Sequence, residues 1–169
     1  MATAPELLGA VPELVIRPMR MLDVTEVVAL ERASYQFPWS EGIFRDCLRV
    51  GYVCRVVSDA RFILGYGVMS TGAGEAHILN LCIGESHRCR GLGRRLMLSL
   101  LERAASAGAG EAFLEVRPSN TAAIRLYLAM GFAQVGVRRG YYQAVGGRED
   151  AAVLKLALGA AGASVPRRP

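Results

Sequence analysis

The stretch LNLCIGESHRCRGLGRR, residues 79–95, decides the fold of this chain. An apolar run over 76–83 ends at a glycine- and arginine-rich turn, where an amphipathic helix begins at Gly91. Glycines let the backbone approach a ligand closely, and the first N–H groups of a helix have no intrahelical partner. Because the helix dipole adds positive potential there, the turn is suited to a pyrophosphate. A glycine-rich turn that only starts a helix remains the alternative.

Two better-known phosphate motifs do not fit this turn. The dinucleotide motif G-x-G-x-x-G lacks its third glycine after Gly93. A Walker loop requires a lysine in the turn, whereas the only lysine of the chain is Lys155.

Outward from the turn, strands and helices alternate. The helix over 91–107 has an apolar stripe and a mainly charged opposite face. We expect strands at 13–17, 52–57, 62–69, 76–83, 112–116, 132–137 and 151–158, and helices at 23–35, 40–50, 91–107 and 120–130. Asp23 is the expected N-cap of the first helix, and Ser119 or Asn120 that of the last. A polar, glycine-rich loop is expected between the last two strands. The pattern predicts an α/β (α+β) domain around one mixed sheet.

The length of 169 residues suits a single domain, which we place at 13–158. Residues 1–12 and 159–169 lack periodicity and are expected to be flexible tails. With no apolar run long enough for a membrane span and no secretory signal at the start, we expect a cytoplasmic protein that does not engage a membrane.

Net charge and cysteine content exclude few classes of function. The formal net charge of +5 favours an anionic partner but does not identify one. The four cysteines are expected to be reduced and mostly buried, and no C-x-x-C pair is present, so no metal site is expected. Cys82 and Cys89 are best interpreted as bystanders rather than nucleophiles, because Cys82 has no apparent histidine partner.

Two polar side chains of the second half, Glu115 and Tyr127, lie on mostly apolar elements. Glu115 interrupts an apolar strand, where a carboxylate is costly without a task or a partner. On strand alternation it shares a face with Phe113 and Arg117. The alternatives are that Glu115 only pairs with an arginine and that Tyr127 is only core packing.

The turn Arg88-x-x-Gly91-x-Gly93 resembles the (Q/R)-x-x-G-x-(G/A) signature of the GNAT acetyltransferases, whose turn holds the pyrophosphate of acetyl-CoA. The resemblance implies the GNAT fold, a mostly antiparallel sheet flanked by helices, with acetyl-CoA as co-substrate. It places the acetyl group and pantetheine beside a strand that usually carries a bulge, and it places Asn120 against acetyl-CoA. The implied acetyl-CoA residues are Leu81, Cys82, Ile83, Arg88, Cys89, Arg90, Gly91, Leu92, Gly93, Arg94 and Asn120.

Further blocks resemble the RimI branch of this family, the ribosomal-protein-alanine N-acetyltransferases. They are Phe37-Pro38-Trp39-Ser40, Leu114 to Asn120 with Ala122 to Ile124, Leu126-Tyr127, Gly131-Phe132, Arg138 to Tyr142 and Gly147 to Ala151. This resemblance assigns the general base to Glu115 and the general acid to Tyr127. It implies direct acetyl transfer in a ternary complex to the α-amino group of a protein, most simply an N-terminal alanine of a ribosomal protein, without direct nucleic-acid recognition.

Acceptor chemistry agrees with an N-terminal substrate. An α-amino group has a pKa of about 7.7–8.0, against about 10.4 for lysine, so a carboxylate deprotonates it more readily. Trp39, Tyr141 and Tyr142 are candidate walls of a peptide groove, and Glu149 and Asp150 are candidates to attract a cationic substrate. The alternatives are a small-molecule amine as acceptor and a non-catalytic CoA-binding or ribosome-binding module.

Overall fold

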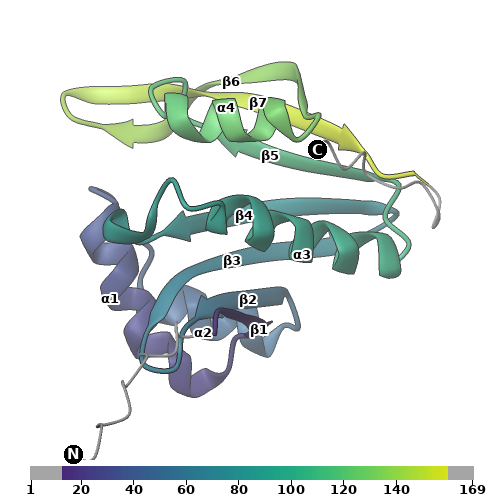
Figure 1. Cartoon of the computed structure of the whole chain (residues 1–169). Helices are drawn as coiled ribbons and strands as arrows, with labels where there is room; N and C mark the ends of the chain where they lie inside the picture. The colour runs from purple at the N-terminus through teal and green to yellow at the C-terminus, as the bar shows by residue number, and fades with distance from the viewer. Residues whose placement is uncertain (1–12, 160–169) are drawn as a thin grey trace, which may run out of the picture.

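The computed structural model describes residues 13–159 and places seven strands in one sheet, in the order β1-β2-β3-β4-β5-β7-β6 (Figure 1). Neighbouring strands are antiparallel except β4 and β5, which are parallel. The predicted element order and the mixed, mostly antiparallel sheet are confirmed. The strands are β1 Val15–Pro18, β2 Val53–Ser58, β3 Ile63–Gly72, β4 Glu75–Ile83, β5 Glu111–Val116, β6 Ala133–Ala144 and β7 Gly147–Ala157. The helices are α1 Val24–Ser34, α2 Glu41–Arg49, α3 Leu92–Ser106 and α4 Thr121–Ala129, with 3-10 turns at Met21–Asp23 and Glu85–His87.

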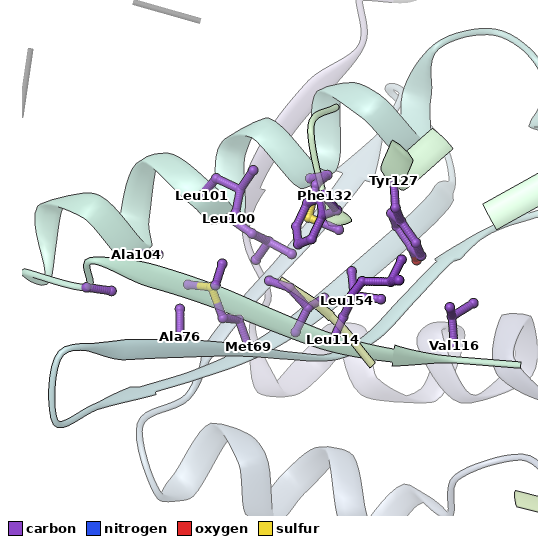
Figure 2. Close-up of a cluster of buried hydrophobic side chains, with 14 of the residues drawn as sticks. Met69, Ala76, Leu100, Leu101, Ala104, Leu114, Val116, Tyr127, Phe132 and Leu154 are labelled. Carbon is purple, nitrogen blue, oxygen red and sulfur yellow. The ribbon is translucent and has the colours of Figure 1, made fainter. Parts of the chain in front are cut away.

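The sheet has a core on each face. Helices α3 and α4 pack on one face with side chains of β3, β4, β5 and β7, as Figure 2 shows. Helices α1 and α2 pack on the other face around Phe44 and Tyr66. The predicted stripe of α3 (Leu92, Leu96, Met97, Leu100, Leu101 and Ala104) is buried throughout. Burial of each leucine or methionine in it stabilises the fold by about 1.5–3 kcal/mol.

Strands β4 and β5 separate along their length, and this separation positions the functional site. Their pairing runs only from Glu75–Glu111 to Ile78–Leu114. At that point β4 carries a bulge, since Val68 of β3 pairs with Asn80 and Met69 with Ile78, which leaves Leu79 as the extra residue. The rest of β4 continues along β3 and away from β5, so the sheet opens on the β5 side.

The prediction of a loop between residues 137 and 151 is wrong. Strands β6 and β7 continue as a hairpin to the pair Ala144–Gly147. Three residues of β6, Arg139 to Tyr141, lie opposite Asp150 alone, and Asp150 accepts a hydrogen bond from the amide of Gly140 (2.7 Å). This part of β6 is largely exposed, so its polar composition resembles that of a loop.

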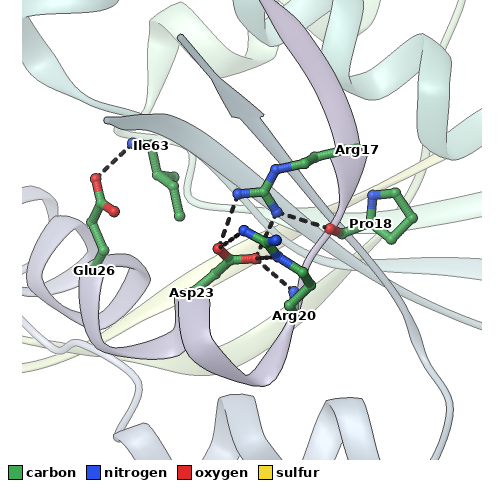
Figure 3. Close-up of polar contacts among 6 residues, drawn as sticks. All are labelled: Arg17, Pro18, Arg20, Asp23, Glu26 and Ile63. Carbon is green, nitrogen blue, oxygen red and sulfur yellow. Dashed lines mark hydrogen bonds and ion pairs between the residues drawn. The ribbon is translucent and has the colours of Figure 1, made fainter. Parts of the chain in front are cut away.

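Asp23 occupies the N-cap position of α1, but its side chain makes no capping hydrogen bond to that helix. Its carboxylate instead accepts from the Arg17 guanidinium at 2.7 and 2.9 Å and from the Arg20 amide at 2.7 Å (Figure 3). A 3-10 turn precedes α1, so the carboxylate points back toward that turn. The Arg17 guanidinium holds the pKa of Asp23 well below its ordinary value. Asn120 does cap α4, accepting from the amide of Ala123 at 3.2 Å.

No helix within residues 13–159 is both long and apolar enough to cross a membrane. Apart from residue 159, the two expected tails lie outside the described residues.

Candidate active site

The turn before α3 has an open backbone at Gly91, whereas Gly93 lies against the side chain of Leu126. Gly91 has a φ of 75° and precedes α3, and an added Cβ there would meet no atom within 4 Å. The first backbone hydrogen bond at this end of α3 runs from the amide of Arg95 to the carbonyl of Gly91, at 3.1 Å. The amides of Leu92, Gly93 and Arg94 therefore precede the helical ladder. They lie at the positive end of a long helix, where an anion binds well.

A cleft of about 590 Å³ extends from this turn along β4 and α4. All of the predicted acetyl-CoA residues except Arg90 line it: Leu81, Cys82, Ile83, Arg88, Cys89, Gly91, Leu92, Gly93, Arg94 and Asn120. Arg90 is exposed and lies outside the lining. The side chain of Leu92 is buried with Val57 and Leu64, so this residue faces the cleft through its backbone.

A second cleft, of about 190 Å³, meets the first where β4 and β5 separate. The two share Tyr35, Leu81, Arg117, Asn120 and Tyr127. The second cleft is also lined by Glu115, by Phe37 and Trp39 from the segment between α1 and α2, and by Tyr142 of the β6–β7 hairpin. Of the predicted groove residues, Trp39 and Tyr142 therefore line it and Tyr141 does not. Tyr141 instead packs edge-on against Tyr142, with ring centroids 4.9 Å apart.

Glu115 lies on β5 with 18% of its side chain exposed. Its Oε1 is 3.0 Å from Nε of Arg138, whose side chain is 57% exposed. Arg138 does not line either cleft, so this guanidinium contacts the carboxylate from the solvent side. Glu115 therefore both pairs with an arginine and lines a cleft.

Tyr127 is one of the five residues that line both clefts. It lies on α4 and is buried, and its ring packs against Phe132 with centroids 5.9 Å apart. Burial raises the pKa of its hydroxyl to about 12, so the hydroxyl keeps its proton at neutral pH.

The carboxylates of Glu149 and Asp150 already have partners within the chain. Glu149 accepts from Arg117 at 3.0 Å and from the amide of Ser119 at 3.1 Å. Arg117 also lies over the ring of Tyr142, 4.3 Å from its centroid. Asp150 accepts a hydrogen bond from Gly140 within the β6–β7 hairpin, and Glu149 joins that hairpin to the segment that follows β5.

Of the cysteines, Cys47, Cys54 and Cys82 are buried and Cys89 is exposed, and all four are free. Burial raises the pKa of the Cys82 thiol, which disfavours the thiolate that a nucleophile needs. In the described part of the chain, no group of three potential metal ligands comes together.

Glu31 of α1 and Tyr35, the residue that follows α1, also lie at the site, although the sequence analysis did not single them out. Tyr35 lines both clefts, and its hydroxyl donates to the carbonyl of Leu81 at 3.0 Å. Glu31 lines the smaller cleft and is 1% exposed. Glu31 follows Val24, Val27 and Val28 on one helical face, so a carboxylate on an apolar stripe was the available signal.

Comparisons with known proteins agree with this geometry. The model of the acetyltransferase (GNAT) family matches residues 21–132. A protein of Escherichia coli named [ribosomal protein bS18]-alanine N-acetyltransferase is 30% identical over 143 residues, which cover 85% of this chain and 97% of the relative. A protein of the same name from Salmonella typhimurium is 32% identical, covering 82% and 95%. The crystal structure of the Escherichia coli ribosomal-protein-S18-alanine N-acetyltransferase superposes with a TM-score of 0.82 at 30% identity, covering 89% and 97%.

Proposed function

This chain belongs to the GNAT family of acetyltransferases, and on that basis we propose that it acetylates the α-amino group of a protein N-terminus, most simply the N-terminal alanine of a ribosomal protein. The observation that carries the proposal is the meeting of two clefts at Tyr127. One is suited to a phosphorylated donor, and the other is a narrow groove with aromatic walls.

Acetyl-CoA is the donor that GNAT acetyltransferases use. In the proposed complex its pyrophosphate lies on the amides at the start of α3, and its pantetheine follows β4 past Ile83 and Leu81. This direction brings the thioester to the place where β4 leaves β5. An amide of β4 near the Leu79 bulge is then available to the thioester oxygen, because β4 has no strand partner on that side.

The acceptor occupies the smaller cleft, with its α-amino group directed toward Tyr127. Glu115 takes a proton from the amine, through water, and the neutral nitrogen forms a bond to the thioester carbon. As the carbon–sulfur bond breaks, the hydroxyl of Tyr127 donates its proton to the departing sulfur, and the proton that the new amide nitrogen loses restores the hydroxyl. Transfer is direct, and the buried, protonated thiol of Cys82 supports a route without an acyl-enzyme.

The size of the smaller cleft, about 190 Å³ between Trp39 and Tyr142, supports a small first residue such as alanine. The names of the two bacterial relatives support a ribosomal protein as the acceptor. The proposal assigns the reaction to the cytoplasm, where ribosomal proteins are made. It gives no part to a membrane or to direct nucleic-acid recognition.

An assay of acetyl-CoA turnover, in which release of the CoA thiol is measured, tests the proposal. The substrates are a peptide that begins Ala-Arg and the same peptide with its N-terminus blocked. We expect turnover only with the free α-amine. Turnover of small amines but not of the free peptide would overturn the proposal and favour a small-molecule acetyltransferase.

A further inference from the structure

A buried carboxylate of α1, Glu31, adjoins the smaller cleft. It is 1% exposed, and donors from three different segments converge on it. The amide of Trp39 donates to its Oε1 at 2.8 Å, and Nδ2 of Asn80 donates to its Oε2 at 3.3 Å. The hydroxyl of Tyr66 on β3 also donates to Oε2. A carboxylate, which only accepts, can take up all three of these hydrogen bonds.

None of these donors carries a charge, so the hydrogen bonds do not neutralise Glu31. Within residues 13–159 the other carboxylate that lines this cleft, Glu115, has Arg138 as its ion-pair partner. Glu149, which is outside the lining, pairs with Arg117. Glu31 forms no ion pair with any described residue. Burying a charge in this way is unfavourable, and its field is strong because little solvent screens it.

Glu31 lies beside the cleft that is proposed to hold the acceptor, so its field acts on the acceptor. Trp39 and Asn80, its two nitrogen donors, themselves line the smaller cleft. An N-terminal peptide brings a positive α-ammonium group into this cleft before the amine is deprotonated. A negative charge at its inner wall attracts that group and does not attract an uncharged terminus.

We propose that Glu31 is a specificity-determining residue, whose uncompensated negative charge selects acceptors with a free, cationic α-ammonium group. This inference rests on the proposed function, because it presumes that the smaller cleft binds a peptide N-terminus. It assigns Glu31 no part in proton transfer, which remains with Glu115 and Tyr127.

The test compares binding of two peptides to the CoA-bound protein by calorimetry. One begins with alanine, and the other begins with lactate, so that a neutral hydroxyl replaces the ammonium group. For the wild-type protein we expect the alanine peptide to bind about tenfold more tightly. In Glu31→Gln we expect this preference to fall to within about twofold.

The glutamine is compatible with the packing around it. Its carbonyl can keep the bond from Trp39, and its amide group can face Tyr66 and Asn80, since a hydroxyl and a reoriented carboxamide both accept. Glu26→Gln is the matched control, because Glu26 lies on the same helix and accepts from the amide of Ile63 at 2.6 Å outside both clefts. Glu26→Gln is expected to retain the full preference.

The outcomes separate this inference from the proposed function. Equal binding of the two peptides by the wild-type protein, without turnover of the alanine peptide, overturns the proposed function. A Glu31→Gln variant that weakens both peptides alike makes Glu31 structural and overturns the inference. If the variant does not fold, the inference can still be tested by NMR of the wild-type protein with a bound alanine peptide that is labelled at its α-nitrogen. Its amine pKa should rise above the free value of about 7.7–8.0 on binding, and an unchanged or lower value overturns the inference.

Discussion

The ion pair between Glu115 and Arg138 allows the two roles of Glu115 to be separated by a pair of substitutions. Glu115→Gln and Arg138→Gln remove the same salt bridge, and each replaces a charged group by a neutral one. If Glu115 serves only as the partner of Arg138, the two variants should behave alike. If Glu115 is the general base, only its own replacement should abolish catalysis.

The expected magnitudes are far apart. The guanidinium is 57% exposed, and an ion pair of that kind contributes at most about 1 kcal/mol, or roughly fivefold in a rate. A general base contributes about 10²–10⁴-fold, or roughly 2.7–5.4 kcal/mol of transition-state stabilisation. We therefore expect Glu115→Gln to lower kcat at least 100-fold and Arg138→Gln to change it less than about fivefold.

The assay is acetyl-CoA turnover with the Ala-Arg peptide, measured beside the melting temperature of each variant. The melting temperatures should shift by similar small amounts, because both variants lose the same pair. Equal losses of kcat in the two variants would refute the assignment of the base. Full turnover by Glu115→Gln would also remove Glu115 from the mechanism.

Three further substitutions test other parts of the site and fold. Tyr127→Phe should lower kcat about 100-fold with little change in acetyl-CoA affinity, whereas the remote Tyr52→Phe should leave both unchanged; a Tyr127→Phe enzyme with normal kcat would exclude the acid role. Cys82→Ala should lose about 1 kcal/mol of stability from its buried position but retain kcat within twofold, and the absence of turnover in a folded variant would favour an acyl-enzyme. The carboxyl of Asp23, whose pKa Arg17 lowers, stabilises the fold above its ordinary pKa of about 3.9 and loses this effect as the pH falls further. Urea unfolding of Asp23→Asn should accordingly depend less on pH below about 4 than that of the wild type, and parallel curves would contradict the pairing.

Local features of the chain could be predicted from the sequence. The glycine–arginine turn and the stripe of α3 depend on residues within a few positions of one another, so the helix start and its buried face were confirmed. The same holds for the Asn120 cap of α4. Most residues that line the larger cleft could also be predicted, because they lie on one strand, one turn and one helix start.

Errors arose where a residue has a distant partner. The polar stretch after Val137 resembles a loop, but it pairs with β7 as an exposed ribbon. Asp23 satisfied the rule for a helix cap, yet its carboxylate accepts hydrogen bonds from Arg17 of the preceding strand and from the amide of Arg20. Both outcomes depend on hydrogen-bond partners that local propensity does not include.

The sequence by itself determined the family, the order of the elements and the identity of the turn that begins α3, since helix ends and glycine conformations are properties of a few adjacent residues. Only the tertiary structure decided that β4 and β5 separate after Ile78, which joins the two clefts at Tyr127. It also decided that Glu115 has an arginine partner while Glu31 is buried among uncharged donors. The physical reason is that the electrostatic state of a carboxylate depends on groups that meet only when separate segments of the chain pack together.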